Sequence, residues 1–446
     1  MVSEWISRDA ARCWHPFTQM KDYELQPPLL ITRARGAKLF SADGNYYYDT
    51  ISSWWCNTLG HNHPRLKAAL RRQMNQLEHT LFAGITHPPA IELAERLTAI
   101  APEGLKKVFF SDNGSTAVEV ALKMSLQYWR NTAQPQRSLF IGLDHGYHGD
   151  TVGAMSVSGR SAFNEVFSPL LFDARHVPAP YCYRCPCGKQ YPSCGIACLE
   201  PLRQICAAEG NRVSALIIEP LLLAAGGMIV YPREYLEGAV AIARGCGAHI
   251  IFDEIATGFC RTGTMFACEQ TAATPDFLCL SKGITAGYLP LGVTLVTEQI
   301  YQAFYDDYTR KKTFYHGHTY TANPLACAVA VEALKIYTEE RVVERVQSQA
   351  VVLQKAMQQF RHLPNVGDVR GIGMVGAVEL VRDRATKEPF AFEQRVGFQV
   401  YREGLAEHLL LRPLGNVIYF FLPFCLRDAE ILRIVRRTHA VLAHLK

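Results

Sequence analysis

The stretch from Leu105 to Asn323 alternates short apolar runs with amphipathic helical ones, and this alternation restricts the fold more than any other feature. In KVFFSDNGSTAVEVALKMSLQYW, an apolar run leads through a polar turn at residues 113–115 into a helix whose apolar stripe contains Val118, Leu122, Leu126 and Trp129. The runs SALIIEP, AHIIFDE and DFLCLSKG indicate further buried strands that end in polar or charged residues. Alternating strands and helices predict an α/β fold with a mostly parallel central sheet covered on both faces. Functional groups then belong at the carboxyl ends of the strands.

The rest of the chain predicts a second, smaller domain. A long helical pattern over residues 325–360 leads to VGDVRGIGMVGAVELV and NVIYFFLPF, which both look like strands. A chain of 446 residues also exceeds the usual size of a single core. We therefore expect an N-terminal segment, residues 1–64, that joins the small domain. A large domain should follow at 65–325, and an α+β small domain at 326–446.

Composition narrows the class of protein. Hydrophobic residues at 49% and charged residues at 20% are ordinary for a globular chain. The net charge is +5, and the sequence contains no run of five residues of like charge. Because proteins that bind nucleic acid usually concentrate their charge on one face, this distribution argues against nucleic acid as a partner. The most apolar stretch, ALIIEPLLLAAGGMIV, is interrupted by Glu219 and Pro220, and the N-terminus shows no signal pattern. We expect a cytoplasmic protein without a membrane partner.

Five of the 14 cysteines fall within PYCYRCPCGKQYPSCGIAC, residues 180–198. In a reducing compartment a disulfide framework is not expected. A spacing compatible with tetrahedral zinc is found for Cys182, Cys185, Cys194 and Cys198, which leaves Cys187 spare. The alternative is a metal-free excursion between elements of the large domain. A zinc-dependent nucleic-acid-binding protein would be a different class again.

A GxGxxG pattern is formed by Gly371, Gly373 and Gly376. A dinucleotide site needs this pattern between a strand and a helix, but the strand-like AVELV follows it here. We expect the glycines to serve a tight bend.

Three features at predicted strand ends together indicate one cofactor. The turn at residues 111–116 has hydroxyl groups and free N–H groups ahead of a helix, which suits either a phosphate or simple N-capping. Asp253 ends one buried strand and Lys282 follows the next. A lysine amine for a Schiff base, a carboxylate and an anion cradle are the groups that pyridoxal phosphate requires.

The motifs FDEIATGFCRTG and SKGITAGYLPLG resemble the signature of class III, fold-type I, pyridoxal-phosphate-dependent aminotransferases. Further similarity lies in SSWW, GYHGDT, FYHGHTYTANPLA and RPLGNVI, so that the resemblance runs from His15 to Gly415. It implies a transaminase with ping-pong kinetics, small-molecule substrates, and a homodimer with active sites at the subunit interface.

The resemblance also implies roles for individual residues. Lys282 would bind the cofactor covalently and move the substrate proton, Asp253 would pair with the pyridine nitrogen, and Tyr147 would stack on the ring. The cofactor phosphate would be held by Gly114 and Ser115, with His318 and Thr319 from the other subunit.

For the substrate, the resemblance implies a site formed by Trp54, Tyr147, Lys282, Gly317 and Arg412. Arg412 would bind a carboxylate remote from the reacting atoms, a task that suits a bidentate guanidinium. Arg261 is a second candidate, expected near the entrance.

Three positions depart from the family pattern. Phe17 replaces a tyrosine that many members have, His318 replaces a proline, and Leu223 lies where relatives often have glutamine. The amino donor therefore stays open between S-adenosylmethionine, which we favour, and lysine. Another class III aminotransferase acting on ω-amino acids or diamines is the alternative.

Overall fold

The computed structural model describes residues 2–445. Its strands are β1 (Ile31–Arg35), β2 (Lys38–Ser41), β3 (Tyr46–Asp49), β4 (Leu105–Ser111), β5 (Leu139–Leu143), β6 (Arg175–Val177), β7 (Val213–Ile218), β8 (Leu222–Leu223), β9 (Ile229–Val230), β10 (His249–Asp253), β11 (Phe277–Leu280), β12 (Gly292–Thr297), β13 (Val366–Ile372), β14 (Val375–Leu380), β15 (Leu409–Leu410) and β16 (Val417–Phe421).

The α-helices are α1 (Val2–Arg12), α2 (Ser52–Trp55), α3 (Pro64–Met74), α4 (Pro88–Ile100), α5 (Gly114–Asn131), α6 (Val152–Val157), α7 (Glu200–Glu209), α8 (Arg233–Gly245), α9 (Glu298–Gln302), α10 (Pro324–Glu339), α11 (Val342–Met357), α12 (Val396–Ala406) and α13 (Asp428–Ala443). Short 3₁₀ helices are η1 (Met20–Glu24), η2 (Glu165–Leu170), η3 (Ala197–Leu199), η4 (Gly210–Arg212), η5 (Ala267–Gln270), η6 (Lys282–Thr285), η7 (Tyr308–Arg310), η8 (Gln358–His362) and η9 (Phe392–Gln394).

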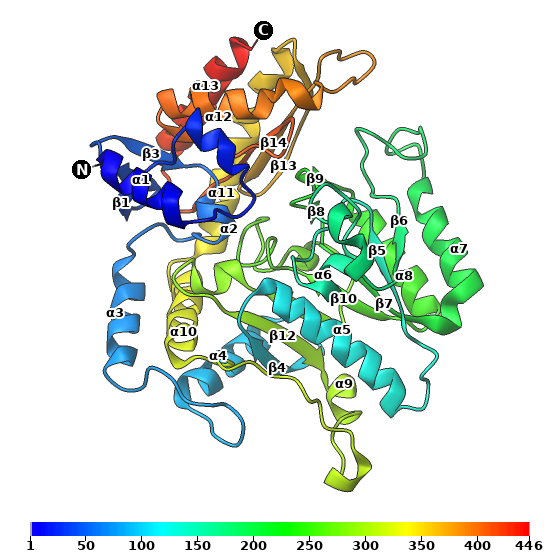
Figure 1. The fold of residues 1–446 in the computed structure, drawn as a ribbon. Coiled ribbons are helices and arrows are strands. Elements are labelled where there is room, and N and C mark those ends of the chain that lie inside the picture. The colour runs from blue at the N-terminus through cyan, green and yellow to red at the C-terminus, as the bar shows by residue number, and fades with distance from the viewer. Residues whose placement is uncertain (1, 446) are drawn as a thin grey trace.

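A seven-stranded sheet in the order β4-β12-β11-β10-β7-β5-β6 forms the centre of the molecule (Figure 1). Only β12 runs antiparallel to its neighbours. Successive residues of β7 and β10 enter different hydrophobic clusters: Ile217 and Ile251 pack with α5, whereas Leu216 and Ile250 pack with α8. Because side chains alternate across a strand, this division places a helix layer on each face. The predicted α/β fold with a mostly parallel sheet is confirmed.

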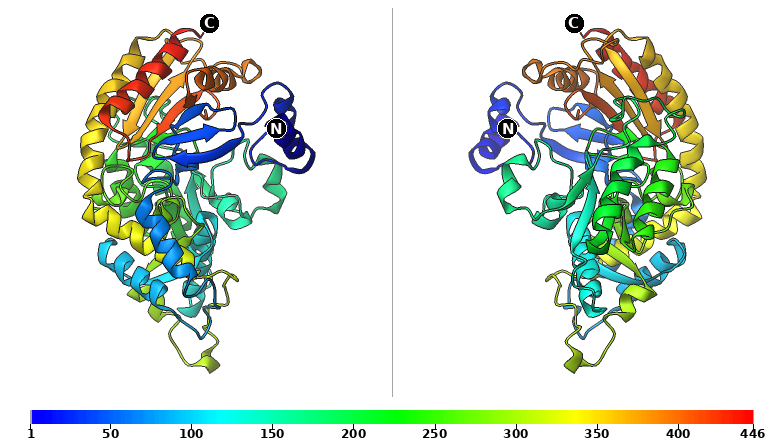
Figure 2. Two further views of the ribbon diagram at one scale, coloured as in Figure 1. Left: turned by 90° about the vertical axis from the view of Figure 1, so that its left-hand side faces the viewer. Right: turned by 90° about the vertical axis from the view of Figure 1, so that its right-hand side faces the viewer.

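The N-terminal strands lie beside the C-terminal part of the chain, as Figures 1 and 2 show by the blue strands next to orange and red segments. β15 pairs parallel with β3 and thereby extends the N-terminal sheet β1-β2-β3. A second, antiparallel sheet contains β13, β14 and β16. The small α+β part is therefore built from both the N-terminal segment and the C-terminus, as expected, while the exact boundaries at residues 64 and 325 stay a prediction.

The helical pattern over residues 325–360 forms two helices rather than one. α10 ends at Glu339, and α11 begins at Val342 after Arg341, which has a left-handed φ of +48°. The side chain of Arg341 is exposed and paired with Glu344, so the left-handed residue lies at the surface between the buried Tyr337 of α10 and Val342 of α11.

The GxGxxG glycines lie in a β-hairpin, which confirms the tight bend. Ile372 of β13 pairs with Val375 of β14, and Gly373 in the turn between them has φ +53°. A Cβ atom on Gly373 would lie 2.3 Å from the carbonyl oxygen of Arg261. Glycine is required here by both the backbone angle and the close approach.

Two further segments complete the description. Residues 178–196, which contain most of the clustered cysteines, connect β6 to η3 without forming a helix or strand. Within residues 2–445, no helix combines the length and the apolarity needed to cross a bilayer.

Candidate active site

Three ionisable residues lie at one edge of the central sheet. Asp253 is the last residue of β10, Glu219 directly follows β7, and Lys282 begins η6 just after β11. β10 pairs in parallel with both β7 and β11, so the three carboxyl ends are adjacent. Strand order therefore brings together side chains that are far apart in the sequence.

Asp253 is 3% exposed, and each of its two carboxylate oxygens has one hydrogen-bond partner. Its Oδ1 accepts the N–H of Ile255 at 3.1 Å, and its Oδ2 lies 2.7 Å from Nδ1 of His148. Nε2 of His148 is buried without a partner among the described residues. His148 was not predicted as a site residue, although it lies in the GYHGDT motif. The Asp253 carboxylate is thus held rigidly by a backbone amide and an imidazole.

Lys282 combines an unusual backbone with a shifted amine. Its φ is +46°, which places a non-glycine residue in the left-handed region, and its Nζ lies 5.1 Å from the centre of the Trp55 ring. Burial lowers the pKa of Lys282, while the nearby carboxylates of Asp253 and Glu219 oppose this shift. A lowered pKa favours the neutral amine, which is the form that acts as nucleophile and base.

Glu219 was missed as a site residue, although it follows a buried strand just as Asp253 ends one. Its carboxylate accepts the N–H groups of Tyr147 at 3.1 Å and Ala224 at 3.0 Å. Burial raises the pKa of Glu219 to about 7. Glu219 thereby fixes the backbone of Tyr147, whose own phenol pKa is raised by burial.

The N-terminus of α5 provides the candidate anion cradle. Asn113 caps the helix by accepting the N–H of Thr116 at 3.0 Å. A Cβ on Gly114 would approach the side chain of Ile255 to 2.8 Å, so the helix start packs closely behind Asp253. The hydroxyl of Ser115 lies 2.7 Å from that of Thr151, at the end of the GYHGDT motif. Helix N–H groups without an intrahelical partner favour an anion at this point.

An aromatic wall connects Tyr147 to the N-terminal segment. The ring of Phe17 lies 5.5 Å from Trp54 and 5.6 Å from Phe163, and Phe163 lies 6.4 Å from Tyr147. The guanidinium of Arg412 lies 4.8 Å from the centre of the Trp54 ring. Figure 2 shows the N-terminal segment beside the teal segment that contains Phe163. The predicted substrate residues Trp54, Tyr147 and Arg412 therefore belong to one connected surface.

The contacts of residues 317–319 differ from those of the other predicted site residues. Gly317 and Thr319 are exposed, and His318 contributes Nδ1 at 3.2 Å from Oδ2 of Asp112, one residue before the Asn113 cap. Among the residues described, no hydrogen bond or ion pair joins this segment to Asp253 or Lys282. The sequence-predicted role of His318 and Thr319 in another subunit's site remains a prediction.

Arg261 does not lie near an entrance, and this expectation is wrong. Its side chain is 1% exposed, donates to the carbonyl oxygen of Leu422, and lies between the rings of Phe421 and Phe424, at 4.1 and 4.6 Å from their centres. Burial lowers its pKa to about 9. Two aromatic faces contributed by a distant part of the chain hold this guanidinium inside the protein.

The donor set at the sheet edge fits pyridoxal phosphate. Besides the free N–H groups of α5, the hydroxyl of Ser111 at the end of β4 is buried without a partner among residues 2–445. Asp253 offers a buried carboxylate for the pyridine nitrogen, and Lys282 offers an amine without a hydrogen-bond partner in the described chain. Cradle, carboxylate and amine are all present.

Comparisons with known proteins agree with this geometry. A family model described as aminotransferase class-III matches residues 19–442. The chain is 48% identical to an adenosylmethionine-8-amino-7-oxononanoate aminotransferase of Geobacter sulfurreducens over 427 residues, which covers 95% of this chain and 94% of the relative.

Comparisons with solved structures also find aminotransferases. The crystal structure of adenosylmethionine-8-amino-7-oxononanoate aminotransferase from Methanocaldococcus jannaschii superposes with a TM-score of 0.94 at 38% identity and covers 99% of both chains. A PLP-bound amine transaminase from an uncultivated Pseudomonas species superposes with a TM-score of 0.93 at 34% identity, covering 97% of this chain and 98% of the other. The chain belongs to the class-III aminotransferase family.

Proposed function

We propose that this protein transfers an amino group from S-adenosylmethionine to 8-amino-7-oxononanoate and so forms 7,8-diaminononanoate in biotin biosynthesis. The observation that carries the proposal is the sheet edge with Lys282 and Asp253 beside the Trp54–Arg412 surface. The substrates are those named for relatives such as the Geobacter sulfurreducens enzyme at 48% identity. As a class III aminotransferase, the protein is a PLP-dependent transaminase.

The cofactor would be held by residues from four parts of the chain. Gly114 and Ser115 at the start of α5 would bind its phosphate, Asp253 would pair with its ring nitrogen, Tyr147 would lie against its ring, and Lys282 would bind it covalently. When bound, pyridoxal phosphate supplies an electron sink for the carbon that loses a proton. The contact from His148 orients the Asp253 carboxylate for this pairing.

Lys282 is the proton-transfer base in this proposal. Its Nζ would take the proton from the amine-bearing carbon of the donor, because burial lowers its pKa and favours the neutral amine. Two substrates that take turns in one site give ping-pong kinetics, which parallel lines in initial-rate plots would test.

Arg412 would bind the carboxylate at the far end of the acceptor. The guanidinium can form two parallel hydrogen bonds to a carboxylate, and its position over Trp54 keeps it beside an apolar surface along which an alkyl chain can lie. Phe17 adds a further apolar edge to that surface. The distance from reacting amine to carboxylate would then select the length of the acceptor.

We also propose that two copies of this chain form the active enzyme in a reducing cytoplasm. Several large aromatic and aliphatic side chains are exposed near segment 317–319 and near residues 81–85, namely Leu81, Ile85, Tyr305, Tyr308, Tyr315 and Tyr320. Burial of such side chains against a second copy would remove apolar area from water. All 14 cysteines are free thiols in the described chain, which suits a reducing compartment.

Hybrid dimers test whether Thr319 serves the other subunit. Lys282→Ala and Thr319→Ala are first measured as homodimers for turnover and cofactor content, and then mixed with subunit exchange. If sites are shared, each hybrid dimer contains one site with both wild-type residues, and activity rises above the mean of the two parents. No rise in mixtures shown to contain hybrids would contradict the sharing of Thr319.

The substrate is tested with purified enzyme, 8-amino-7-oxononanoate and one donor at a time. Diaminononanoate formed with S-adenosylmethionine is the expected result, measured by mass spectrometry. Product only with lysine would change the donor. The alternative is an amine transaminase such as the one from the Pseudomonas species. No diaminononanoate with either donor, together with turnover of a simple amine and pyruvate, would favour that alternative.

A further inference from the structure

The cysteine-rich loop, residues 180–198, has no core of its own. None of its residues from Tyr181 to Cys198 is fully buried, and no helix or strand precedes η3 within it. Small chain units without an apolar core are often stabilised by a disulfide or a metal ion. All five cysteines of the loop are nevertheless free.

Two turns give the loop a definite shape. The N–H of Gly188 donates to the carbonyl of Cys185 at 3.0 Å, and the N–H of Ala197 donates to that of Cys194 at 3.2 Å. Gly188 and Gly195 have left-handed φ angles of +63° and +57°. One turn thus follows the CxxC pair, and the other lies within the CxxxC pair.

The thiols of the loop line a common cavity. A small, partly open space of about 20 Å³ is bordered by Cys182, Cys185, Cys187, Cys194 and Cys198, with Tyr235 of α8 and Pro180 among the apolar residues around it. A space of this size holds one water-sized group.

We propose that Cys182, Cys185, Cys194 and Cys198 bind one structural Zn²⁺ ion in this cavity. Four thiolates in two closely spaced pairs match the tetrahedral coordination of structural zinc, and soft sulfur ligands exclude magnesium and calcium. Four S–H bonds break, four Zn–S bonds form, and four protons pass to the solvent. Within residues 2–445, no three Cys, His, Asp or Glu side chains already meet as metal ligands, so the thiols turn inward about their Cα–Cβ bonds when the ion binds.

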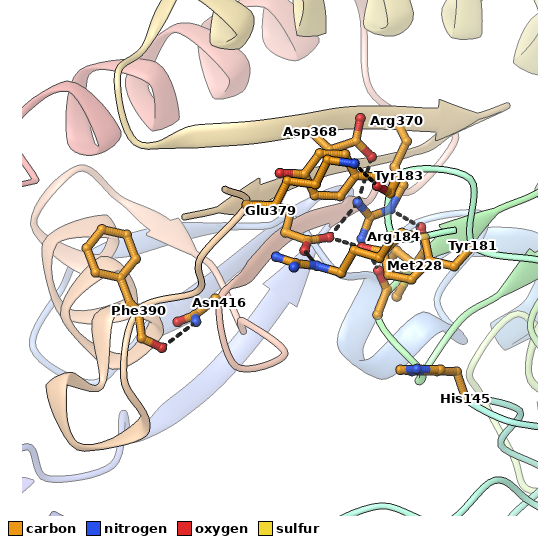
Figure 3. A network of polar contacts seen from close by, with 12 residues as sticks. His145, Tyr181, Tyr183, Arg184, Met228, Asp368, Arg370, Glu379, Phe390 and Asn416 are labelled. Carbon is orange, nitrogen blue, oxygen red and sulfur yellow. Dashed lines mark hydrogen bonds and ion pairs between the residues drawn. The ribbon is translucent and has the colours of Figure 1, made fainter. Parts of the chain in front are cut away.

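Such an ion would hold the loop against the small α+β part. Figure 3 shows Arg184 and Tyr181 meeting Glu379 of β14, and the distance from Arg184 Nε to Glu379 Oε1 is 2.6 Å. The carbonyl of Tyr183 accepts from Lys387 Nζ at 2.6 Å. Tyr181, Tyr183 and Arg184 are each adjacent in sequence to Cys182 or Cys185. The ion would therefore fix the residues that link the loop to the small α+β part.

The first test uses the wild-type protein purified without chelator. We expect about one zinc ion per chain by mass spectrometry, released in proportion to thiol modification by a mercurial reagent. Co²⁺ in place of zinc should give sulfur-to-metal charge-transfer absorption and the strong visible bands of a tetrahedral site. A protein without zinc that also fails to take up Zn²⁺ or Co²⁺ overturns the proposal, as do disulfides or iron found at these cysteines.

The second test compares single variants. Cys182→Ser and Cys194→Ser should lose most of the zinc and be cleaved faster by trypsin after the exposed Lys189. Cys187→Ser, in the same loop but outside the proposed ligand set, should keep both its zinc and its resistance to trypsin. Cofactor absorbance at Lys282 should persist in all three, which shows that the fold survives. Full zinc content in Cys182→Ser, or its loss in Cys187→Ser only, overturns the assigned ligands.

Discussion

The sheet edge and the cysteine-rich loop both collect reactive side chains, but they hold them in different ways. At the edge, adjacent strands position Asp253, Glu219 and Lys282, and each carboxylate has hydrogen-bond partners. In the loop, the thiols line a cavity, and all of them except Cys198 of η3 lie outside helices and strands. The difference teaches that chemistry depends on rigid placement by the fold, whereas a cluster of reactive residues in sequence can serve only local stability.

The largest expected effect is on Lys282. Lys282→Ala should reduce turnover on the order of 10⁴-fold or more, because both the covalent bond and the proton transfer depend on this amine. The thermal midpoint should stay close to that of the wild type. Lys335→Ala, which removes a half-buried lysine paired with Glu92 far from the sheet edge in sequence, is the control and should keep its activity. Full turnover by Lys282→Ala would refute its catalytic role.

The next prediction concerns Glu379 and tests whether the contacts of the cysteine-rich loop contribute to stability rather than to catalysis. Glu379→Gln removes a carboxylate that is 5% exposed and paired with Arg184 and Arg370, so the free energy of unfolding should fall by about 3–5 kcal/mol. Urea unfolding measures this change, while kcat per folded molecule should remain near the wild-type value.

The control for Glu379 is Glu234→Gln, an exposed carboxylate near Tyr191 of the same loop, with little expected effect on stability. If Glu379→Gln instead lost turnover at unchanged stability, the contrast between a catalytic edge and a stabilising loop would be wrong.

A smaller effect is expected at Asp253. Asp253→Asn keeps the size and the backbone contact of the side chain but removes its charge, so turnover should fall on the order of 10²-fold. Cofactor affinity should weaken in the same variant. His148→Gln, which loses only the contact that orients Asp253, should show a smaller loss in kcat with the same sign. A larger loss in His148→Gln than in Asp253→Asn would mean that His148 acts on its own.

The smallest expected effect is on the pH dependence of the free energy of unfolding. The pKa of Glu219 is raised from about 4.5 to about 7 by burial, so the folded state binds this proton more tightly than the unfolded state. Stability from this group is therefore lost as pH rises from about 4.5 to 7. In Glu219→Gln the decline over that range should be weaker, on the order of 2 kcal/mol, measured by denaturant unfolding at several pH values. Equal slopes would contradict the buried, protonated Glu219.

The sequence predicted the sheet and its polar ends because strand periodicity and strand termini are local properties. Asp253 and Lys282 were identifiable because each stands where an apolar run stops. Glu219 has the same signal but was read as an interruption of an apolar stretch. His148 was not identifiable, since its partner lies 105 positions away.

Non-local packing explains the error at Arg261. The aromatic rings that enclose Arg261 come from residues 421 and 424, so no pattern around position 261 reports its burial. The helical pattern over residues 325–360 is confirmed, but its continuous periodicity does not report the turn at Arg341 that divides it into α10 and α11.

The turn at Ser52–Trp55 limits how the substrate surface can change. Four successive residues have left-handed φ angles between +45° and +74°, a conformation that costs about 1–2 kcal/mol per residue. Asp49 accepts the N–H of Ser53 at 2.8 Å and holds the turn in place. Its two tryptophans contact opposite ends of the site, Trp54 at Arg412 and Trp55 at Lys282. A substitution that relaxes this turn is expected to displace both tryptophans, so a change in the surface proposed for the acceptor would also shift the ring beside Lys282, the lysine proposed as catalytic.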